Sequence, residues 1–457
     1  MKTADIVRIG NAQAFWGDSP DAPARLMSQQ PDLDFLTLDY LAEVSLSILA
    51  LQREKDPAAG YARDFIGVLK SLVPFWKKGS RVRVVCNAGG LNPEGCALAC
   101  VEALKAAGCG HLKVFVVSGD DVLPVLGKDP GAALYRNLET GESMARIAGR
   151  LVAANAYLGA RPIAEALQSG ADIVVTGRVA DPSLTVGPCM AHLGWTWEDW
   201  DKLASATVAG HLIECGTQVT GGILTGWMEL GEVGQIGFPF VEMEAGGSFV
   251  ITKPDNTGGE VSLRTVKEQL LYEVGDPDQY LSPDVTVSFL NVSLNPVGED
   301  RIAVCSARGR APTDSYKVSA AYRDGFKSHG LLTVFGRDAA EKARRCGEIV
   351  LQRLEMSGAK PERSLIECLG AGASVAGVGN GASKSNLMEA VLRVSVADPR
   401  RDVVERFTRE LAPLITSGPQ GVTGYAAGRP KVQEVFGYWP CLIAKTQVKP
   451  VVKEITG

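Results

Sequence analysis

The chain has 457 residues, of which 46% are hydrophobic and 22% are charged, a composition typical of a globular protein with a buried core. Its net charge of −5 argues against the basic surface that a nucleic-acid-binding protein needs. The length predicts two or three domains. The opening residues lack a signal-peptide pattern, and no apolar stretch approaches the roughly 20 residues of a membrane span, so we expect a cytoplasmic protein with no membrane partner.

Ten cysteines are scattered along the chain, and none of them forms a Cys-x-x-Cys pair. Structural zinc sites need paired ligands at close spacing. We therefore expect the cysteines to be small buried hydrophobic residues in a reducing compartment, not metal ligands.

Five apolar, β-rich segments in the first half of the chain each lead directly into polar residues. They are 5–10, 34–38, 81–86, 112–117 and 172–176. Helical patterns separate them, for example at 40–55 and 93–107, and no hairpin is evident. This alternation predicts an α/β fold with a mainly parallel sheet and flanking helices. Ligands of such sheets bind at the carboxyl ends of the strands, so we expect the site there.

The character of the sequence changes near residue 235, where short strands and glycine pairs replace the strand–helix alternation. The change predicts two domains. An α/β domain at 1–235 would carry the cleft, and a smaller α+β domain at 236–457 would supply an interface or a cap. The Gly- and Ala-rich residues 370–381 are expected to form a loop.

The segment Asn87-Ala-Gly-Gly-Leu-Asn-Pro93 lies between a strand and a helix that Pro93 opens. Gly89 and Gly90 would let the backbone approach a ligand, and free N–H groups at a helix start favour an anion. Asn87 and Asn92 flank the glycines and are predicted to bind substrate with them. The alternative is a tight turn without a ligand.

Two further groups follow the fourth and fifth segments. Ser118 is a candidate for substrate binding, and the adjacent Asp120 and Asp121 could hold a magnesium ion or cap a helix. Arg178 can grip a carboxylate or phosphate through two hydrogen bonds, with Asp181 beside it. The alternative for these last two residues is a structural ion pair.

Asp39 and Glu43 follow the second segment, four residues apart, so they share one face of a helix. Two such carboxylates could divide the roles of acid and base, or one could cap the helix while the other is solvated. Asn11 ends the first segment and is predicted to bind substrate at the same edge of the sheet.

The string from His211 to Gly222 is the other dense group of polar residues. His211 and Glu214 could act as acid and base, Cys215 could act as a nucleophile, and Thr217 could contact substrate. The alternative is a core histidine beside an inert thiol.

Several segments together resemble the acyclic terpene utilisation protein family. They are Ile9–Asn11, Phe15–Asp18, Leu38–Glu43, Asn87–Pro93, Asn155–Ala160, Gly177–Asp181, His211–Gly222, Thr265–Tyr272 and the loop at 417–430. The resemblance implies carboxylate catabolism through CoA thioesters and adds no catalytic motif of its own. Relatives carry Asn directly after the Gly-Gly pair, where this chain has Ile223, a departure that bears on substrate specificity.

Two hypotheses follow. The first is a catabolic enzyme, a lyase or hydratase acting on a branched or unsaturated carboxylate or its CoA thioester. Arg178 and the Asn87–Asn92 loop would hold the anionic group, and Asp39, Glu43 or His211 would move the proton. The second is a non-catalytic binding or scaffold subunit that works with an acyl-CoA carboxylase or a small partner protein. We expect a homo-oligomer in both cases.

Overall fold

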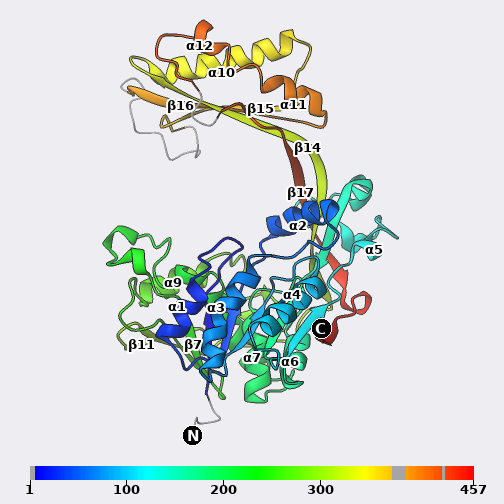
Figure 1. Cartoon of the computed structure of the whole chain (residues 1–457), viewed down its shortest axis with the longest axis vertical. Helices are drawn as coiled ribbons and strands as arrows, with labels where there is room; N and C mark the ends of the chain where they lie inside the picture. Colours follow the sequence, from blue (N-terminus) through cyan, green and yellow to red (C-terminus); the bar gives the residue numbers. More distant parts are fainter. Residues whose placement is uncertain (1–5, 373–386, 425–427, 457) are drawn as a thin grey trace. The chain divides into compact units, whose positions relative to one another are not determined.

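The computed structural model describes residues 6–372, 387–424 and 428–456 (Figure 1). The chain forms two compact units, one of Met1–Ala321 with Tyr438–Gly457 and one of Tyr322–Gly437. Residues 236–321 belong to the first unit, so the two compact units do not divide the chain at the domain boundary expected near residue 235. Most of the loop expected at 370–381, and residues 425–427 of the 417–430 loop, lie outside the described residues.

A ten-stranded sheet forms the centre of the first unit, in the order β11-β12-β8-β7-β1-β2-β3-β6-β4-β18. The five segments expected as strands form its middle: β1 (Ile6–Asn11), β2 (Phe35–Leu38), β3 (Arg83–Cys86), β6 (Ile173–Thr176) and β4 (Val114–Ser118). These neighbours pair in parallel. Their side chains are largely buried, because a parallel sheet is covered on both faces.

Antiparallel strands extend the parallel part on both sides, so the sheet as a whole is mixed. They are β7 (Phe240–Glu244), β8 (Phe249–Thr252), β12 (Arg301–Cys305) and β11 (Ser293–Gly298) beyond β1, and β18 (Val451–Ile455) beyond β4. The α/β class is confirmed, whereas mainly parallel pairing describes the five middle strands and not the whole sheet. The added strands all come from parts of the chain after residue 239.

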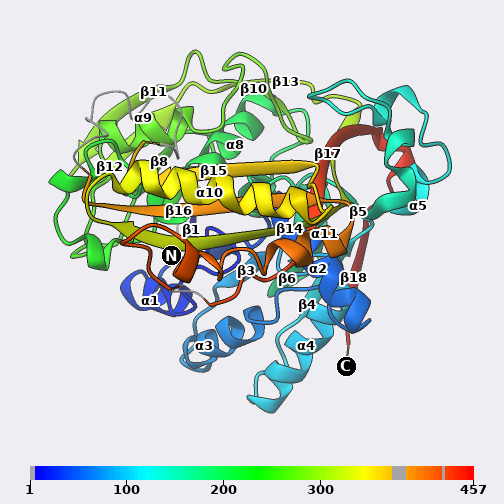
Figure 2. The same ribbon diagram turned by 90° about the horizontal axis from the view of Figure 1, so that it is seen from above.

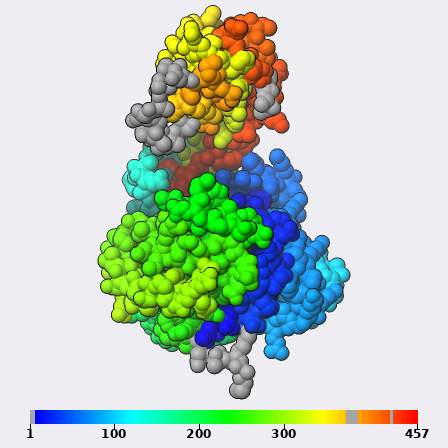
Figure 3. All heavy atoms as spheres, turned by 90° about the vertical axis from the view of Figure 1, so that its left-hand side faces the viewer, coloured from blue at the N-terminus to red at the C-terminus, as the bar shows by residue number. Residues whose placement is uncertain are grey.

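Helices surround this sheet in the first unit. They are α1 (Ala22–Gln29), α2 (Glu43–Lys55), α3 (Phe65–Lys77), α4 (Pro93–Ala106), α5 (Leu123–Leu126), α6 (Arg161–Gln168), α7 (Ser183–Leu193), α8 (Trp200–Glu214) and α9 (Leu263–Leu271). Helices α1, α3 and α4 share one apolar core with β2, β3, β4 and β6. Blue N-terminal residues and green residues from the middle of the chain lie side by side on one face of this unit (Figure 3).

Two smaller elements of the first unit matter for the site. Strand β5 (Leu151–Ala156) precedes Tyr157, and a small sheet joins β13 (Arg308–Arg310), β10 (Thr286–Ser288) and β9 (Tyr280–Leu281). Eight of the ten cysteines are buried, which agrees with their expected role as small hydrophobic residues. In the part of the chain that the structure describes, no helix has the length and apolarity needed to cross a bilayer.

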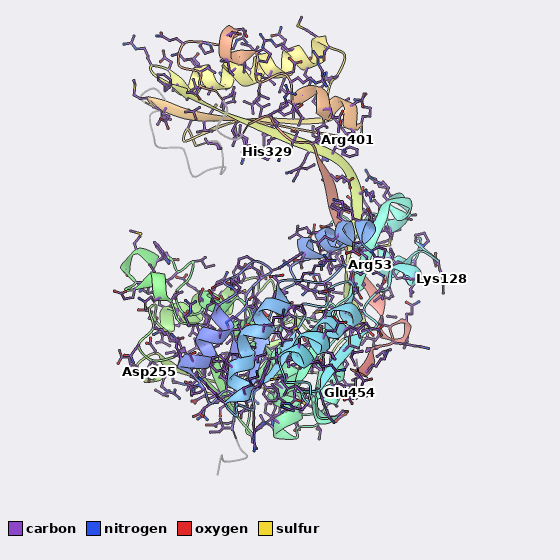
Figure 4. The ribbon with its side chains drawn as sticks, viewed as in Figure 1. Arg53, Lys128, Asp255, His329, Arg401 and Glu454 are labelled. Carbon is purple, nitrogen blue, oxygen red and sulfur yellow. The ribbon has the colours of Figure 1, made fainter. Side chains whose placement is uncertain are left out.

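The second unit is a sheet with helices packed on it. Strands β15 (Arg363–Leu369), β16 (Glu389–Asp398) and β14 (Ser315–Phe335) pair antiparallel, and β17 (Gln433–Ala444) follows β14 in the strand order. Helix α10 (Ala339–Met356) lies along β15 and β16, as Figure 2 shows, and shares an apolar core with them. Helices α11 (Arg401–Phe407) and α12 (Leu414–Ser417) complete the described part. Arg401 is labelled in Figure 4 on this unit. Its guanidinium lies 5.5 Å from the centre of the Phe326 ring.

A substitution at Gly89 tests how tightly the loop after β3 is packed. A Cβ at this position would lie 2.5 Å from the carbonyl oxygen of Thr176, so Gly89→Ala should destabilise the protein by about 1–3 kcal/mol in urea unfolding. Gly67→Ala, in helix α3, is the matched control, because its Cβ would meet nothing within 4 Å. That change should be neutral or stabilising by up to about 1 kcal/mol. Equal effects of the two changes would contradict the close packing.

Candidate functional site

A cavity of about 430 Å³ in the first unit brings together five of the residues singled out in the sequence. They are Glu43, Arg178, Asp181, His211 and Glu214. Tyrosine side chains and Lys317 complete much of the polar wall. A cavity of this volume suits a small organic ligand.

The sheet explains why the residues meet. Glu43 opens the helix after β2, whereas Arg178 and Asp181 follow β6. Both strands are neighbours of β3 and run parallel to it, so their carboxyl ends share one edge. His211 and Glu214 come from the last turn of α8.

Arg178 is 1% exposed and is held by three kinds of contact. Its Nη1 donates to the carbonyl oxygen of Leu41 at 2.9 Å and to Oδ1 of Asp181 at 2.5 Å. The guanidinium carbon lies 4.0 Å from the centre of the Tyr157 ring. Burial alone would lower the arginine pKa, but the charges of Asp181 and of other nearby groups outweigh it and raise that pKa. Arg178 is therefore permanently charged.

Tyr157 links Arg178 to a second carboxylate. Its hydroxyl donates to Oε1 of Glu43 at 2.7 Å, and Lys317 Nζ lies 3.7 Å from the same oxygen. Lys317 Nζ is also 5.0 Å from the centre of the Tyr157 ring. Burial raises the pKa of Glu43, but the Tyr157 hydrogen bond and the charges of Arg178 and Lys317 lower it further than burial raises it. Glu43 is ionised at neutral pH.

His211 and Glu214 form a buried acid–base pair. His211 Nδ1 lies 3.1 Å from Oε1 of Glu214, and Nε2 lies 3.0 Å from the carbonyl oxygen of Gln269. Because a carbonyl only accepts, Nε2 carries a proton and Nδ1 is the nitrogen that titrates. The other carboxylate oxygen of Glu214, Oε2, is buried without a hydrogen-bond partner.

Both members of this pair hold protons more tightly than usual. Burial raises the pKa of Glu214 to about 7, against the lowering effect of the His211 hydrogen bond and charge. Burial would lower the pKa of His211, but the hydrogen bond and charge of Glu214 raise it overall. A carboxyl group that titrates near neutrality can both give and take a proton.

Asp39 lies behind the cavity wall and does not line it. Its Oδ1 accepts from Asn87 Nδ2 at 2.7 Å, and Asn87 Oδ1 in turn accepts from the Tyr40 backbone N–H at 2.6 Å. Burial raises the Asp39 pKa well above its usual range, and the charge of Asp181 adds to the effect. Asp39 and Asn87 thus join the ends of β2 and β3.

The loop expected to bind an anion uses its own donors within the fold. Gly89 N–H donates to the Thr176 carbonyl at 3.1 Å, and Gly90 N–H donates to the Asn87 carbonyl at 3.3 Å. Asn92 Oδ1 accepts from Gly95 N–H at 3.0 Å and so caps α4. The alternative of a tight turn accounts for these contacts of Gly89, Gly90 and Asn92, and none of the three lines the cavity.

Asp120 and Asp121 also accept hydrogen bonds from backbone N–H groups. Asp120 Oδ2 accepts from Asn155 Nδ2 and from Arg178 N–H, both at 2.8 Å, and burial raises its pKa to about 6. Asp121 Oδ1 accepts from Leu123 N–H at 3.1 Å at the start of α5. Across the described ranges, no three His, Cys, Asp or Glu side chains gather as a metal-binding set. The contact of Asp121 fits the helix-capping alternative, and the magnesium ion stays a prediction for this pair.

Four further candidates lie outside the cavity wall. Asn11 Nδ2 donates to the carbonyls of Ile213 and Glu214, at 2.6 and 2.8 Å, and so fixes the end of α8. Burial raises the pKa of Cys215, which keeps its thiol protonated and a poor nucleophile. Ser118 pairs with Val451 at the sheet edge, and the Thr217 carbonyl accepts from the N–H of Gly222.

The sequence model of a protein family, described as acyclic terpene utilisation family protein AtuA, matches residues 7–454 of the chain. The chain belongs to this family. Comparison with curated proteins and with solved structures gives no match. The resemblance found in the sequence is thus confirmed, and it connects this AtuA family member with acyclic terpene utilisation.

The cavity of this AtuA family protein also has polar residues that were not singled out from the sequence, among them Tyr157, Glu273, Tyr280 and Lys317. Glu273 has a left-handed backbone with φ of 59°, just after α9, where Gly or Asn is usual. A glutamate at such a position could have been noticed. Lys317 reaches the site because Tyr157 N–H donates to its carbonyl at 2.8 Å, a pairing between distant segments that the sequence does not reveal.

Glu214→Gln should make stability less dependent on pH. A carboxyl with a raised folded pKa stabilises the protein fully below its unfolded pKa, and this contribution is lost as pH rises through the folded value of about 7. Relative to the variant, the wild type should lose roughly 1–3 kcal/mol of unfolding free energy between about pH 5 and pH 8. Urea unfolding at several pH values measures this difference. A constant difference across that range would contradict the raised pKa.

Proposed function

We propose that this AtuA family protein is a catabolic enzyme, a lyase or hydratase, that acts on a branched or unsaturated carboxylate or its CoA thioester. The observation that supports the proposal most is the His211–Glu214 pair in the cavity wall. Its carboxyl titrates near pH 7 and keeps one oxygen without a partner. Such a group suits proton transfer to or from carbon at neutral pH.

In the elimination direction, Glu214 Oε2 takes a proton from the carbon next to the carboxyl or thioester group. The neighbouring carbon–oxygen bond then breaks, and the leaving hydroxyl takes a proton to depart as water. Hydration is the reverse. His211 Nδ1 faces Glu214 and stabilises the carboxylate form by its hydrogen bond and positive charge. The Tyr157 hydroxyl, hydrogen-bonded to Glu43, is the candidate donor to the leaving oxygen.

Positive charge is needed where the enolate oxygen develops. Arg178 and Lys317 both line the cavity, and their charged groups lie 4.0 and 5.0 Å from the centre of the Tyr157 ring. Preorganised positive charges stabilise such an oxyanion. We assign the carboxylate or thioester carbonyl of the substrate to this end of the cavity.

Exchange of carbon-bound hydrogen tests the proposal directly. The protein is incubated in deuterated buffer with branched and unsaturated acids and their CoA thioesters, and deuterium at the carbon next to the carbonyl is measured by NMR. Glu214→Gln and His211→Asn should slow this exchange by roughly a hundredfold or more, because the proton acceptor or its partner is lost. Glu165→Gln, on the exposed side of α6, removes the same charge elsewhere and should exchange like the wild type.

Wild-type exchange in Glu214→Gln would contradict the role of the pair. Absence of exchange on every compound, together with stable co-purification of another protein, would favour the scaffold hypothesis. Arg178 is unsuitable for this rate test, because its removal leaves the buried Asp39 and the neighbouring Asp181 without a compensating charge. Lys317→Met is the better probe, since its side chain is 45% exposed and its loss should raise KM with little change in folding.

A further inference from the structure

A second cavity, of about 310 Å³, lies in the first unit between helix α2 and strand β5. Its wall comes from the later turns of α2, from the residues around the start of α5 and from four consecutive residues of β5. No described residue lines both this cavity and the one that holds His211 and Glu214. The second cavity is therefore a separate site, and the proposed reaction gives it no role.

A buried amide in the wall of this cavity has an oxygen without a partner. Asn155, near the end of β5, is 1% exposed, and its Nδ2 donates to Asp120 Oδ2 at 2.8 Å. Because a carboxylate only accepts, the nitrogen of the amide must face Asp120, which fixes Oδ1 on the other side. Asn155 Oδ1 is buried and makes no hydrogen bond. Buried polar atoms are nearly always hydrogen-bonded, so this oxygen needs a donor that the described part of the protein does not supply.

Asp121 lies directly opposite Asn155 in the same wall. The two residues form an isolated antiparallel bridge, and the neighbouring Val122 N–H donates to the Ala154 carbonyl at 2.9 Å. Residues opposite each other in such a bridge have Cα atoms about 4.5–5.5 Å apart. The Asp121 carboxylate accepts from Leu123 N–H at 3.1 Å and has room for further donors. Two acceptors thus lie side by side, and a ligand with neighbouring hydroxyl groups would satisfy both.

A guanidinium in the same cavity provides the opposite charge. Arg53, labelled in Figure 4, comes from the last turn of α2. Its Nη1 donates to the Leu91 carbonyl at 3.0 Å, and a Cβ at Gly60 would lie 3.3 Å from its Cδ, so its stem packs against that loop. Among the described residues it has no carboxylate partner. An arginine that is held in place without a carboxylate suits the anionic group of a ligand.

The remaining lining residues favour one kind of anion. Glu54 and Asp121 line the cavity, and they repel a doubly charged phosphate more strongly than a singly charged carboxylate. Ala50, Leu123 and Val152 present apolar side chains, against which the C–H groups of a carbon chain can pack. The cavity thus combines a place for a carboxylate, two acceptors for hydroxyl groups and an apolar wall.

We propose that the second cavity binds a polyhydroxylated carboxylate, a sugar acid, with its carboxylate at Arg53 and its hydroxyl groups at Asn155 Oδ1 and Asp121. A hydroxyl that donates to Asn155 Oδ1 leaves the hydrogen bond from Asn155 to Asp120 in place. The volume of about 310 Å³ accommodates a small acid of this kind. The proposal does not depend on the reaction assigned to the first cavity, because the lining residues differ.

Titration calorimetry of the full chain with matched compounds tests the proposal. Gluconate carries the carboxylate and the hydroxyl groups, sorbitol lacks the carboxylate, hexanoate lacks the hydroxyl groups, and glucose 6-phosphate carries a phosphate instead. Arg53→Gln should weaken gluconate binding roughly tenfold to a hundredfold, because a charge-assisted contact is lost. Asp121→Asn replaces an acceptor by a donor and should weaken it by roughly threefold or more. Both side chains are exposed, so neither change should unfold the protein.

Two further variants are the controls. Arg25→Gln removes an exposed arginine of α1, and Lys317→Met removes a cation of the first cavity. Both should bind gluconate like the wild type. Because a plain carboxylate can enter the first cavity, any hexanoate binding should keep its affinity in Arg53→Gln.

Absence of gluconate binding would overturn the proposal and leave Asn155 Oδ1 to a water molecule. Gluconate affinity that Arg53→Gln leaves unchanged would overturn it as well. Sorbitol binding as tight as that of gluconate would remove the role of the guanidinium, and hexanoate binding that depends equally on Arg53 would remove the role of the hydroxyl groups, so either result rejects the sugar acid. Tighter binding of glucose 6-phosphate that depends on Arg53 would assign the cavity to a phosphate ester instead.

Discussion

A charged side chain that is buried away from water needs compensating partners within the protein, because removing an ion from water costs several kcal/mol after relaxation. Arg178 meets this requirement with the Asp181 carboxylate, the Leu41 carbonyl and the face of Tyr157. These partners come from the segments that follow β6, β2 and β5. One guanidinium therefore fixes three loops against one another, and the wall of the cavity depends on it.

The central strands could be found in the sequence because both of their faces are buried. A short continuous apolar run such as 172–176 is typical of a strand that is buried on both faces, and the polar residues after it mark the end of the strand. The outer strands are different. β7 pairs with β1, and β18 pairs with β4, through partners hundreds of residues away, so no local pattern reveals them. The mixed character of the sheet follows from those distant pairings.

The site shows the same division between local and distant information. The rule that ligands bind at strand ends gathers Glu43, Arg178 and Asp181 in one cavity, since these residues follow adjacent parallel strands. The rule does not say which donors are free. The Gly89 N–H is occupied by the carbonyl of Thr176, on another strand, and only the packed structure reveals that contact.

The order of elements along the chain has a consequence for biosynthesis. The second unit lies between two parts of the first, and Leu442, which lines the cavity, comes after it in the sequence. A chain emerging from the ribosome therefore makes β4 long before its antiparallel neighbour β18 exists. The open edge of β4 is exposed to mispairing during that interval. The cavity gains one of its lining residues, Leu442, only after the second unit has been synthesised.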